Sequence, residues 1–226
     1  MSSHEIIPGI LTGVLSAVIF NPLDKIIFSC CMENKKITDR SVWKNLFKGS
    51  LNNVGTRLIT SGLYFSVIDH YSTINPNKTE VAMLTAMVSS ITNPIQLVKF
   101  HSWFHNCSSV LSIQTIFKSY GFHGMTIGLI PLISRDFVFN YIYLNNKKED
   151  HIYNIAVISS ALVVSAPLNL IKNKKYSTNE SLKSIVTNFK FSQLGIGMTV
   201  GRSCLSFYAS QMIYNKVKDF YSKASN

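Results

Sequence analysis

The sequence predicts an all-α membrane protein of six transmembrane helices, arranged as three pseudo-symmetric repeats of two helices each. Three observations lead to this fold class: long stretches without charge, prolines at a regular interval, and a glycine with a second apolar segment after each proline. The uncharged stretches are residues 6–23, 81–98 and 152–171. Each has about the 17 to 25 residues that a membrane-spanning helix needs.

A second apolar segment follows each uncharged stretch and carries an arginine near its start or middle. The mean hydropathy of the chain, +0.18, is modest for six spans. Polar loops and an internally polar bundle would lower this average, so we prefer the membrane fold to one or two soluble domains. The second segments are residues 50–68 with Arg57, 125–146 with Arg135 and Asp136, and 191–215 with Arg202.

The prolines define the repeat. Pro22, Pro94 and Pro167 lie in "NPLDKII", "NPIQLVK" and "APLNLIK", 72 and 73 residues apart, and a fixed period of this kind indicates an internal repeat. A glycine follows each proline after 27, 34 and 28 residues, at the end of "LFKG", "MTIG" and "SQLG". The predicted repeats are residues 1–75, 76–150 and 151–226.

The distribution of charge sets the expected orientation and argues against nucleic acid as a partner. The net charge is +11, but the basic residues form no stripe with interleaved aromatic residues. Ten basic residues and three acidic ones lie in the loops within the repeats, whereas the loops between repeats carry three of each. Basic loops remain on the inner side of a membrane.

No pattern of catalytic or metal-binding residues is present in the sequence. The four cysteines form no CxxC pair, and the histidines have neither a nucleophile partner nor zinc-ligand spacing. We therefore expect a protein that is not an enzyme and that needs no cofactor or metal.

Three pairs of spans, each with a proline motif and a glycine before the second span, resemble the mitochondrial carrier family over essentially the whole chain. The motif of that family is P-x-[acidic]-x-x-[basic]; in this chain only Asp24 keeps the acidic residue, and only Lys99 and Lys172 keep the basic one. The resemblance implies six helices around a central cavity, which exposes a solute alternately to the two sides of the mitochondrial inner membrane. It implies that the termini face the intermembrane space and that the basic loops face the matrix. The chain is shorter than most carriers, and its abundant Asn, Ile and Lys are typical of an AT-rich genome, such as that of a parasite or of a large virus acting on host mitochondria.

In that family the motif residues form a network of salt bridges that closes the cavity on the matrix side. Here the resemblance implies an ion pair between Asp24 and Lys99 and a hydrogen bond between Gln96 and Lys172. The third pair contains no charge, so we expect a weak gate. The candidate gate residues are Pro22, Asp24, Pro94, Gln96, Lys99, Pro167, Asn169 and Lys172.

The candidate solute-binding residues lie seven and eight residues after each glycine. Charged side chains at membrane depth are costly and face the bundle interior, where they mark a transport path. Arg57 is the weakest candidate, because its guanidinium could instead extend to the membrane interface. The candidates are Thr56, Arg57, Arg135, Asp136 and Arg202.

Two classes of solute remain open. The adjacent Arg135 and Asp136 resemble what carriers of amino acids and related zwitterions have at this place. An excess of basic residues over Asp24 and Asp136 concentrates anions instead, which favours a phosphate-bearing solute such as a nucleotide. Tyr141 and Tyr208, with Tyr64 and Phe65, are candidates for stacking a base, although aromatic residues at such spacing usually serve packing.

We expect a monomer whose partners are a small-molecule solute and membrane lipid. A membrane adaptor that resembles a carrier without transporting is the alternative from another class, and the weak gate favours it. Charged residues kept at membrane depth favour the carrier, because an adaptor has no use for them.

Overall fold

The described part of the chain is all-α, with turns and loops between the helices, as the sequence predicts. The computed structural model describes residues 3–59, 77–148 and 150–224, and no strand occurs in these three ranges. Short 3₁₀ turns at Arg40–Trp43, Gly121–Thr126 and Phe191–Leu194 connect some of the helices. The α-helices are α1 (Ser3–Met32), α2 (Ser50–Ile59), α4 (Lys78–Ser90), α5 (Asn93–Phe104), α6 (Ser109–Tyr120), α7 (Leu129–Asn146), α8 (His151–Thr178), α9 (Leu182–Thr187) and α10 (Ile196–Ala224).

Three helical segments in the described ranges are long and apolar enough to cross a membrane. They are Ile10–Met32, Ser109–Asn146 and Ile152–Thr178. α4 and α5, which are bent by 57° relative to each other, are together also long and apolar enough to cross a membrane as one broken span. These segments overlap four of the six predicted spans, so the protein has the apolar helices of a membrane-associated protein.

The other two predicted spans differ from these four. α10 has 29 residues, which is long enough to span a membrane, but it is less apolar than the candidate spans. In the span predicted at 50–68, α2 covers residues up to Ile59, and the remainder lies outside the described residues.

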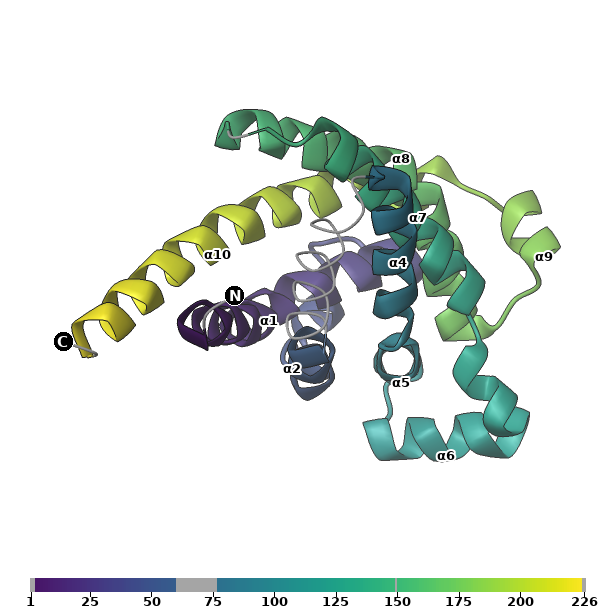
Figure 1. Ribbon diagram of the computed structural model, residues 1–226. Helices are drawn as coiled ribbons and strands as arrows, with labels where there is room; N and C mark the ends of the chain where they lie inside the picture. The colour runs from purple at the N-terminus through teal and green to yellow at the C-terminus, as the bar shows by residue number, and fades with distance from the viewer. Residues whose placement is uncertain (1–2, 60–76, 149, 225–226) are drawn as a thin grey trace.

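The long helices pack side by side into a closed arrangement. α1 packs between α2 and α10, α8 packs between α10 and α7, and α7 packs on α4. α5 contacts both α2 and α8. The first helix therefore lies against the last one, and the beginning of α1 and the end of α10 lie on the side of the molecule away from α6 and α9 (Figure 1).

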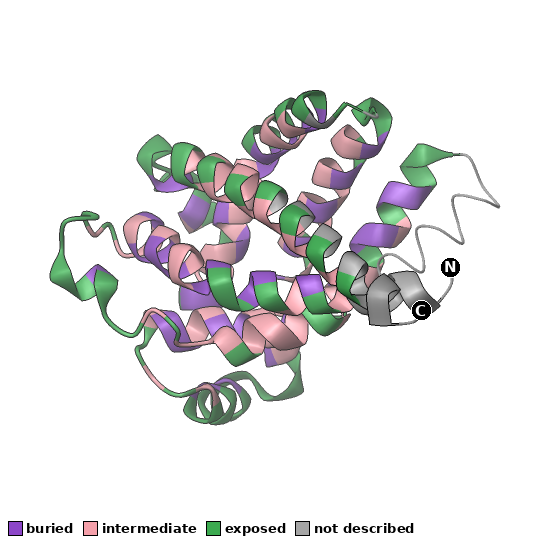
Figure 2. Ribbon diagram, turned by 90° about the vertical axis from the view of Figure 1, so that its left-hand side faces the viewer, coloured by how far each residue is buried: buried purple, intermediate pink, exposed green. Residues whose placement is uncertain are grey.

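Two surface helices interrupt stretches that the sequence analysis treats as loops. α6 and α9 begin at serine N-caps, where the Oγ atoms of Ser108 and Ser181 each accept a hydrogen bond of 3.2 Å from the backbone N–H three residues later. Such caps satisfy one of the free N–H groups at a helix start. α6 lies at the bottom of both views and is mostly exposed (Figure 1, Figure 2).

A glycine in the left-handed region precedes α2, α7 and α10. The φ angles are +80° at Gly49, +74° at Gly128 and +55° at Gly195, values that residues with a Cβ rarely adopt. A Cβ at any of the three would also overlap a side chain of another helix, and that side chain always lies nine residues after one of the prolines. The overlapping side chains are Trp103 for Gly49, Tyr176 for Gly128 and Cys31 for Gly195.

Asparagine bridges hold two of these glycine turns to the preceding helix. The amide of Asn21 donates to the two carbonyls three and one residues before Gly49, at 2.8 and 3.3 Å. Asn93 makes the same two bonds before Gly128, at 2.7 and 3.3 Å. Ala166 occupies the corresponding place before the third proline and has no amide to donate. We call the first two contacts the asparagine bridges.

The three prolines have different effects on their helices. Pro94 is the second residue of α5 and follows the break after α4. α1 and α8 continue through Pro22 and Pro167, respectively. The three prolines lie in similar sequence motifs, but of the three helices only the one at Pro94 is interrupted.

Candidate functional site: a basic cavity inside the bundle

The candidate gate and solute residues meet in one cavity. This cavity has a volume of about 520 Å³ and is lined by residues of α1, α2, α4, α5, α7, α8 and α10. The candidate gate residues Pro22, Pro94 and Pro167 do not line it. The predicted site residues that line the cavity are Asp24, Thr56, Arg57, Gln96, Lys99, Arg135, Asp136, Asn169, Lys172 and Arg202.

The cavity lining is basic. Five of its side chains are Arg or Lys, whereas two are carboxylates. Charges enclosed by low-dielectric walls are screened less than surface charges, so this excess attracts anions into the cavity. The basic residues are Arg57, Lys99, Arg135, Lys172 and Arg202, and the acidic residues are Asp24 and Asp136.

Asp24 pairs with Arg202, and the ion pair predicted between Asp24 and Lys99 is wrong. Arg202 approaches the carboxylate with two nitrogens: Nε lies 2.8 Å from Oδ1, and Nη2 donates to Oδ2 at 3.0 Å. α10 packs directly against α1, so the guanidinium reaches across one helix contact. The two-point fork is a stronger and more directional bond to a carboxylate than an ammonium can make.

Lys99 and Lys172 bind side-chain amides. Lys99 Nζ donates to Asn53 Oδ1 at 2.5 Å. Lys172 Nζ donates to Gln96 Oε1 at 3.5 Å, which agrees with the hydrogen bond expected between these residues. Both lysines are buried. Their nearest hydrogen-bond partners therefore carry no charge.

Arg135 and Asp136 form a unit with α4. Arg135 Nη1 donates to Asp136 Oδ1, and Ser89 Oγ donates to Oδ2 of the same carboxylate. Asp136 is buried, with 7% of its surface exposed. Its charge is thus already balanced by the neighbouring guanidinium and hydroxyl.

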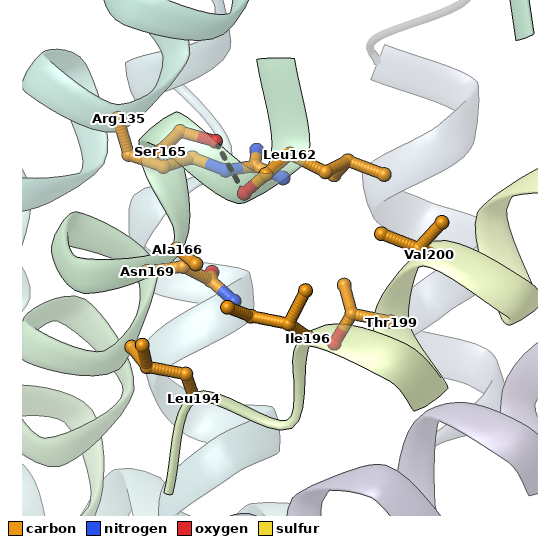
Figure 3. A pocket seen from close by; sticks show the side chains of 9 residues that line it. All are labelled: Arg135, Leu162, Ser165, Ala166, Asn169, Leu194, Ile196, Thr199 and Val200. Carbon is orange, nitrogen blue, oxygen red and sulfur yellow. Dashed lines mark hydrogen bonds between the residues drawn. The ribbon is translucent and has the colours of Figure 1, made fainter. Parts of the chain in front are cut away.

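Arg135 also lines a narrow crevice between α8 and the start of α10. Figure 3 shows its side chain extending past Ser165 and Leu162 of α8. Ser165 Oγ donates to the Leu162 carbonyl at 3.4 Å, so the hydroxyl is satisfied within its own helix. Asn169 and Ile196 line the crevice below the arginine (Figure 3).

The two residues on α2 play different parts. Thr56 Oγ1 donates to the Asn52 carbonyl at 2.9 Å, one helical turn earlier, which satisfies its hydrogen. Arg57 lines the cavity, so it contributes to the basic lining. It is also exposed, so the extension of its guanidinium to the membrane interface stays an alternative.

An aromatic cluster adjoins the two lysines, and the sequence analysis did not predict it. Phe100 is at its centre, with ring centroids 5.4 Å from Phe28, 5.5 Å from Trp103 and 5.7 Å from Tyr176. These residues come from α1, α5 and α8. Trp103 and Tyr176 are the same side chains that pack on the glycine turns, so the cluster joins the cavity wall to those turns.

Of the aromatic residues proposed to stack a base, Tyr141 and Tyr208 do not line the cavity. Tyr141 and Tyr208 are 43% and 63% exposed. Tyr64 and Phe65 lie outside the described residues. Phe139 is the cavity-lining aromatic residue closest to an arginine: its ring centroid lies 5.8 Å from Cζ of Arg135.

Asn53 and Ser89 are site residues that the sequence analysis missed. Each is a short polar residue within a helix. Its residue type does not indicate a binding site, because Ser and Asn are also common on helix faces that contact water. The asparagine bridges had a visible signal, since Asn precedes proline in two of the three motifs.

Neither a protein-family model nor a curated protein matches this chain.

Proposed function

We propose that this protein is a solute carrier of the mitochondrial carrier type, with six helices in three repeats, that moves a small anionic metabolite across the mitochondrial inner membrane by alternating access. A nucleotide is the solute class we favour. The observation that carries the proposal is the cavity of about 520 Å³ into which five basic and two acidic side chains converge. Its volume is within the range of small-molecule binding sites.

The recurrence of the glycine contacts supports the three-repeat architecture. Each glycine packs on the residue nine positions after the proline of the following repeat, and the third glycine packs on the first repeat. Contacts related in this cyclic way are expected of three similar units around one axis. The proposed repeats are residues 1–75, 76–150 and 151–226.

The partners of Asp136 favour a nucleotide over a zwitterion. A carboxylate that binds a solute ammonium does so best when its charge is not already compensated by a neighbouring cation and its lone pairs are directed into the cavity. Both oxygens of Asp136 already accept hydrogen bonds, one from Arg135 and one from Ser89. The carboxylate is therefore well placed to orient Arg135. An amino acid remains the second candidate, because a carboxylate and a guanidinium are adjacent in the cavity.

Uptake by the purified full chain in proteoliposomes tests the proposal. We expect uptake of at least one nucleotide, and little uptake of amino acids or dicarboxylates. Accumulation of amino acids without nucleotides would contradict the preferred solute, and no uptake of any of these solutes would favour the non-transporting adaptor.

Arg202 provides a variant test with a matched control. Arg202→Ala should abolish uptake, but it also leaves Asp24 without its partner. The double variant Asp24→Asn with Arg202→Gln removes both charges together, so it should insert and fold while still failing to transport. If the double variant takes up solute at the wild-type rate, Arg202 does not bind the solute.

A further inference from the structure

Lys99 and Lys172 are two buried lysines on different helices that line the same cavity. Lys99 lies in α5 and is 6% exposed, and Lys172 lies in α8 and is 5% exposed. Each follows a motif proline by five residues, so they occupy equivalent places in their helices. Buried lysines are uncommon unless a counter-charge accompanies them.

Neither lysine has a carboxylate partner in the described part of the chain. Each ammonium has three N–H donors. Lys99 uses one of them on Asn53 and Lys172 uses one on Gln96, both neutral amide oxygens. The two carboxylates of the cavity are held by Arg202 and by Arg135. Donors on both lysines are therefore left for a ligand.

The aromatic cluster places the two ammonium groups around one ring. Both lie over the ring of Phe100, with Nζ 5.1 Å from its centroid for Lys99 and 5.6 Å for Lys172. Trp103 and Tyr176 extend this surface, at 4.2 Å from Lys99 and 5.8 Å from Lys172. Aromatic faces attract cations but carry no net charge, so they cannot neutralise the pair.

We infer that Lys99 and Lys172 form a binding site for a phosphate group, next to the aromatic cluster and separate from the arginines. Two ammonium groups match the charge of a phosphate dianion, and lysine binds phosphate as a point charge without a fixed geometry. The amide nitrogens of Asn53 and Gln96 donate elsewhere, to Asn21 and to Thr92, so they hold the lysine-binding oxygens in place. A bound phosphate would join α5 to α8, where neutral Gln96 and Asn169 leave both lysines without a carboxylate.

The phosphate group has two sources, inorganic phosphate or the phosphate end of a solute. Equilibrium dialysis of the purified full chain against radiolabelled inorganic phosphate detects the site without transport. We expect saturable binding, and we expect Lys99→Gln with Lys172→Gln to weaken it at least about tenfold, a loss of about 1.4 kcal/mol. Lys25→Gln is the matched control, because Lys25 is 7% exposed and does not line the cavity.

Thermal unfolding separates a ligand site from a structural role. Phosphate should raise the melting temperature of the wild-type chain and of Lys25→Gln, and should leave that of the double variant unchanged. Without phosphate, the double variant should melt at the wild-type temperature or above, because two buried charges without an ion pair are gone and a glutamine side chain can still donate to the amide oxygens of Asn53 and Gln96. A lower melting temperature in the absence of phosphate, or phosphate binding that survives in the double variant, would overturn the inference.

Competition identifies the source of the phosphate, and this step alone rests on the proposed function. If a nucleoside triphosphate displaces labelled phosphate and the matching nucleoside does not, the site binds the phosphate end of the solute. If neither the nucleoside triphosphate nor the nucleoside displaces the labelled phosphate, the site binds inorganic phosphate. A chain that binds phosphate but takes up no nucleotide would remove the proposed solute and leave this site intact.

Discussion

Asp24 has two cationic neighbours on the cavity wall, and the arginine forms the ion pair with it. The side chain of Arg202 is 15% exposed and that of Asp24 is 26% exposed, so both are partly shielded from water. The guanidinium contacts both carboxylate oxygens, with one hydrogen bond from Nη2 and one ion-pair contact from Nε, whereas an ammonium is a point charge without this planar geometry. Lys99 is then left to an asparagine.

The first prediction concerns this pair. Asp24→Asn removes one charge of a two-point bond and leaves Arg202 without its counter-charge, so we expect the free energy of unfolding to fall by about 1.5 to 3 kcal/mol. Thermal unfolding in detergent measures the change. Lys35→Gln is the control: Lys35 lies 2.5 Å from Glu33, and its side chain, 38% exposed, is more solvated than that of Glu33, 16% exposed, so we expect a loss of about 1 kcal/mol or less. Equal effects of the two substitutions would show that the fork contributes no more than a surface pair.

The second prediction separates the two solute classes at Asp136. In Asp136→Asn the carboxylate charge next to Arg135 is lost, so binding and uptake of a nucleotide should be kept or strengthened. If the solute were a zwitterion, its ammonium would lose its partner at a cost of about 1 to 3 kcal/mol, and uptake would fall about tenfold or more. Initial uptake rates in proteoliposomes measure this difference. Ser89→Ala is the companion variant, since it removes a partner of Asp136 while keeping the charge.

The sequence predicts which residues line the cavity better than it predicts how they pair. A charge within an apolar helix has to face away from lipid, so Arg135, Asp136 and Arg202 could be placed from one sequence. The choice of partner depends on which helices are adjacent and how far each side chain reaches. Asp24 therefore pairs with Arg202, against the expectation, and Asn53 could not be foreseen as the partner of Lys99.

The helix break between α4 and α5 depends on more than its proline. Thr92 Oγ1 donates to the Ser89 carbonyl at 2.7 Å, and Gln96 Nε2 donates back to Thr92 Oγ1 at 2.9 Å. Side chains that bond the nearby backbone compete with the regular helix pattern. In α1 the place of Thr92 is taken by Phe20, which has no hydroxyl, and in α8 by Ser165, whose bond to the carbonyl three residues earlier is longer, 3.4 Å; both helices continue. A repeat in the sequence thus fixes where a break can occur, while local side chains decide whether it does.

The third prediction tests a glycine turn. Gly128→Ala places a Cβ on a residue with φ +74°, where it would also overlap the ring of Tyr176. A residue with a Cβ in this backbone region costs about 1 to 3 kcal/mol. We expect a lower midpoint of thermal unfolding, followed by tryptophan fluorescence, with weaker packing of the aromatic cluster.

Gly201→Ala is the control for this substitution. Gly201 lies within α10, and an added Cβ would meet no atom within 4 Å. Alanine is better than glycine inside a helix by about 0.5 to 1 kcal/mol, so this variant should be as stable as the wild type or slightly more stable. If Gly128→Ala behaves like Gly201→Ala, the turn does not require glycine.

The contact between α1 and α10 closes the molecule and joins the two ends of the chain. Ser16 Oγ and Ser210 Oγ lie 2.8 Å apart across it. If transport requires the helices to separate, a covalent bond at this place should prevent it.

The fourth prediction uses that contact. Ser16→Cys with Ser210→Cys should form a bridge within one chain on oxidation, or with a short bifunctional thiol reagent, detected by mass spectrometry of the linked peptides. Uptake should be lost on bridging and recovered on reduction. The two single variants, treated in the same way, control for the native cysteines. A bridged protein that transports normally would show that α1 and α10 move as one body.

The third glycine turn has no asparagine bridge, so the three turns are not held equally to their neighbouring helices. Asn21 and Asn93 tie two glycine turns to their neighbouring helices, whereas Ala166 leaves the turn at Gly195 without such a tie. The crevice of Figure 3 lies at that joint, lined by Ala166, Leu194 and Ile196. If all three glycine turns had an asparagine bridge, the three helix contacts would resist separation equally. The contact without a bridge should separate first. If the proposed carrier opens by separating its helices, we therefore expect the motion to start between α8 and α10.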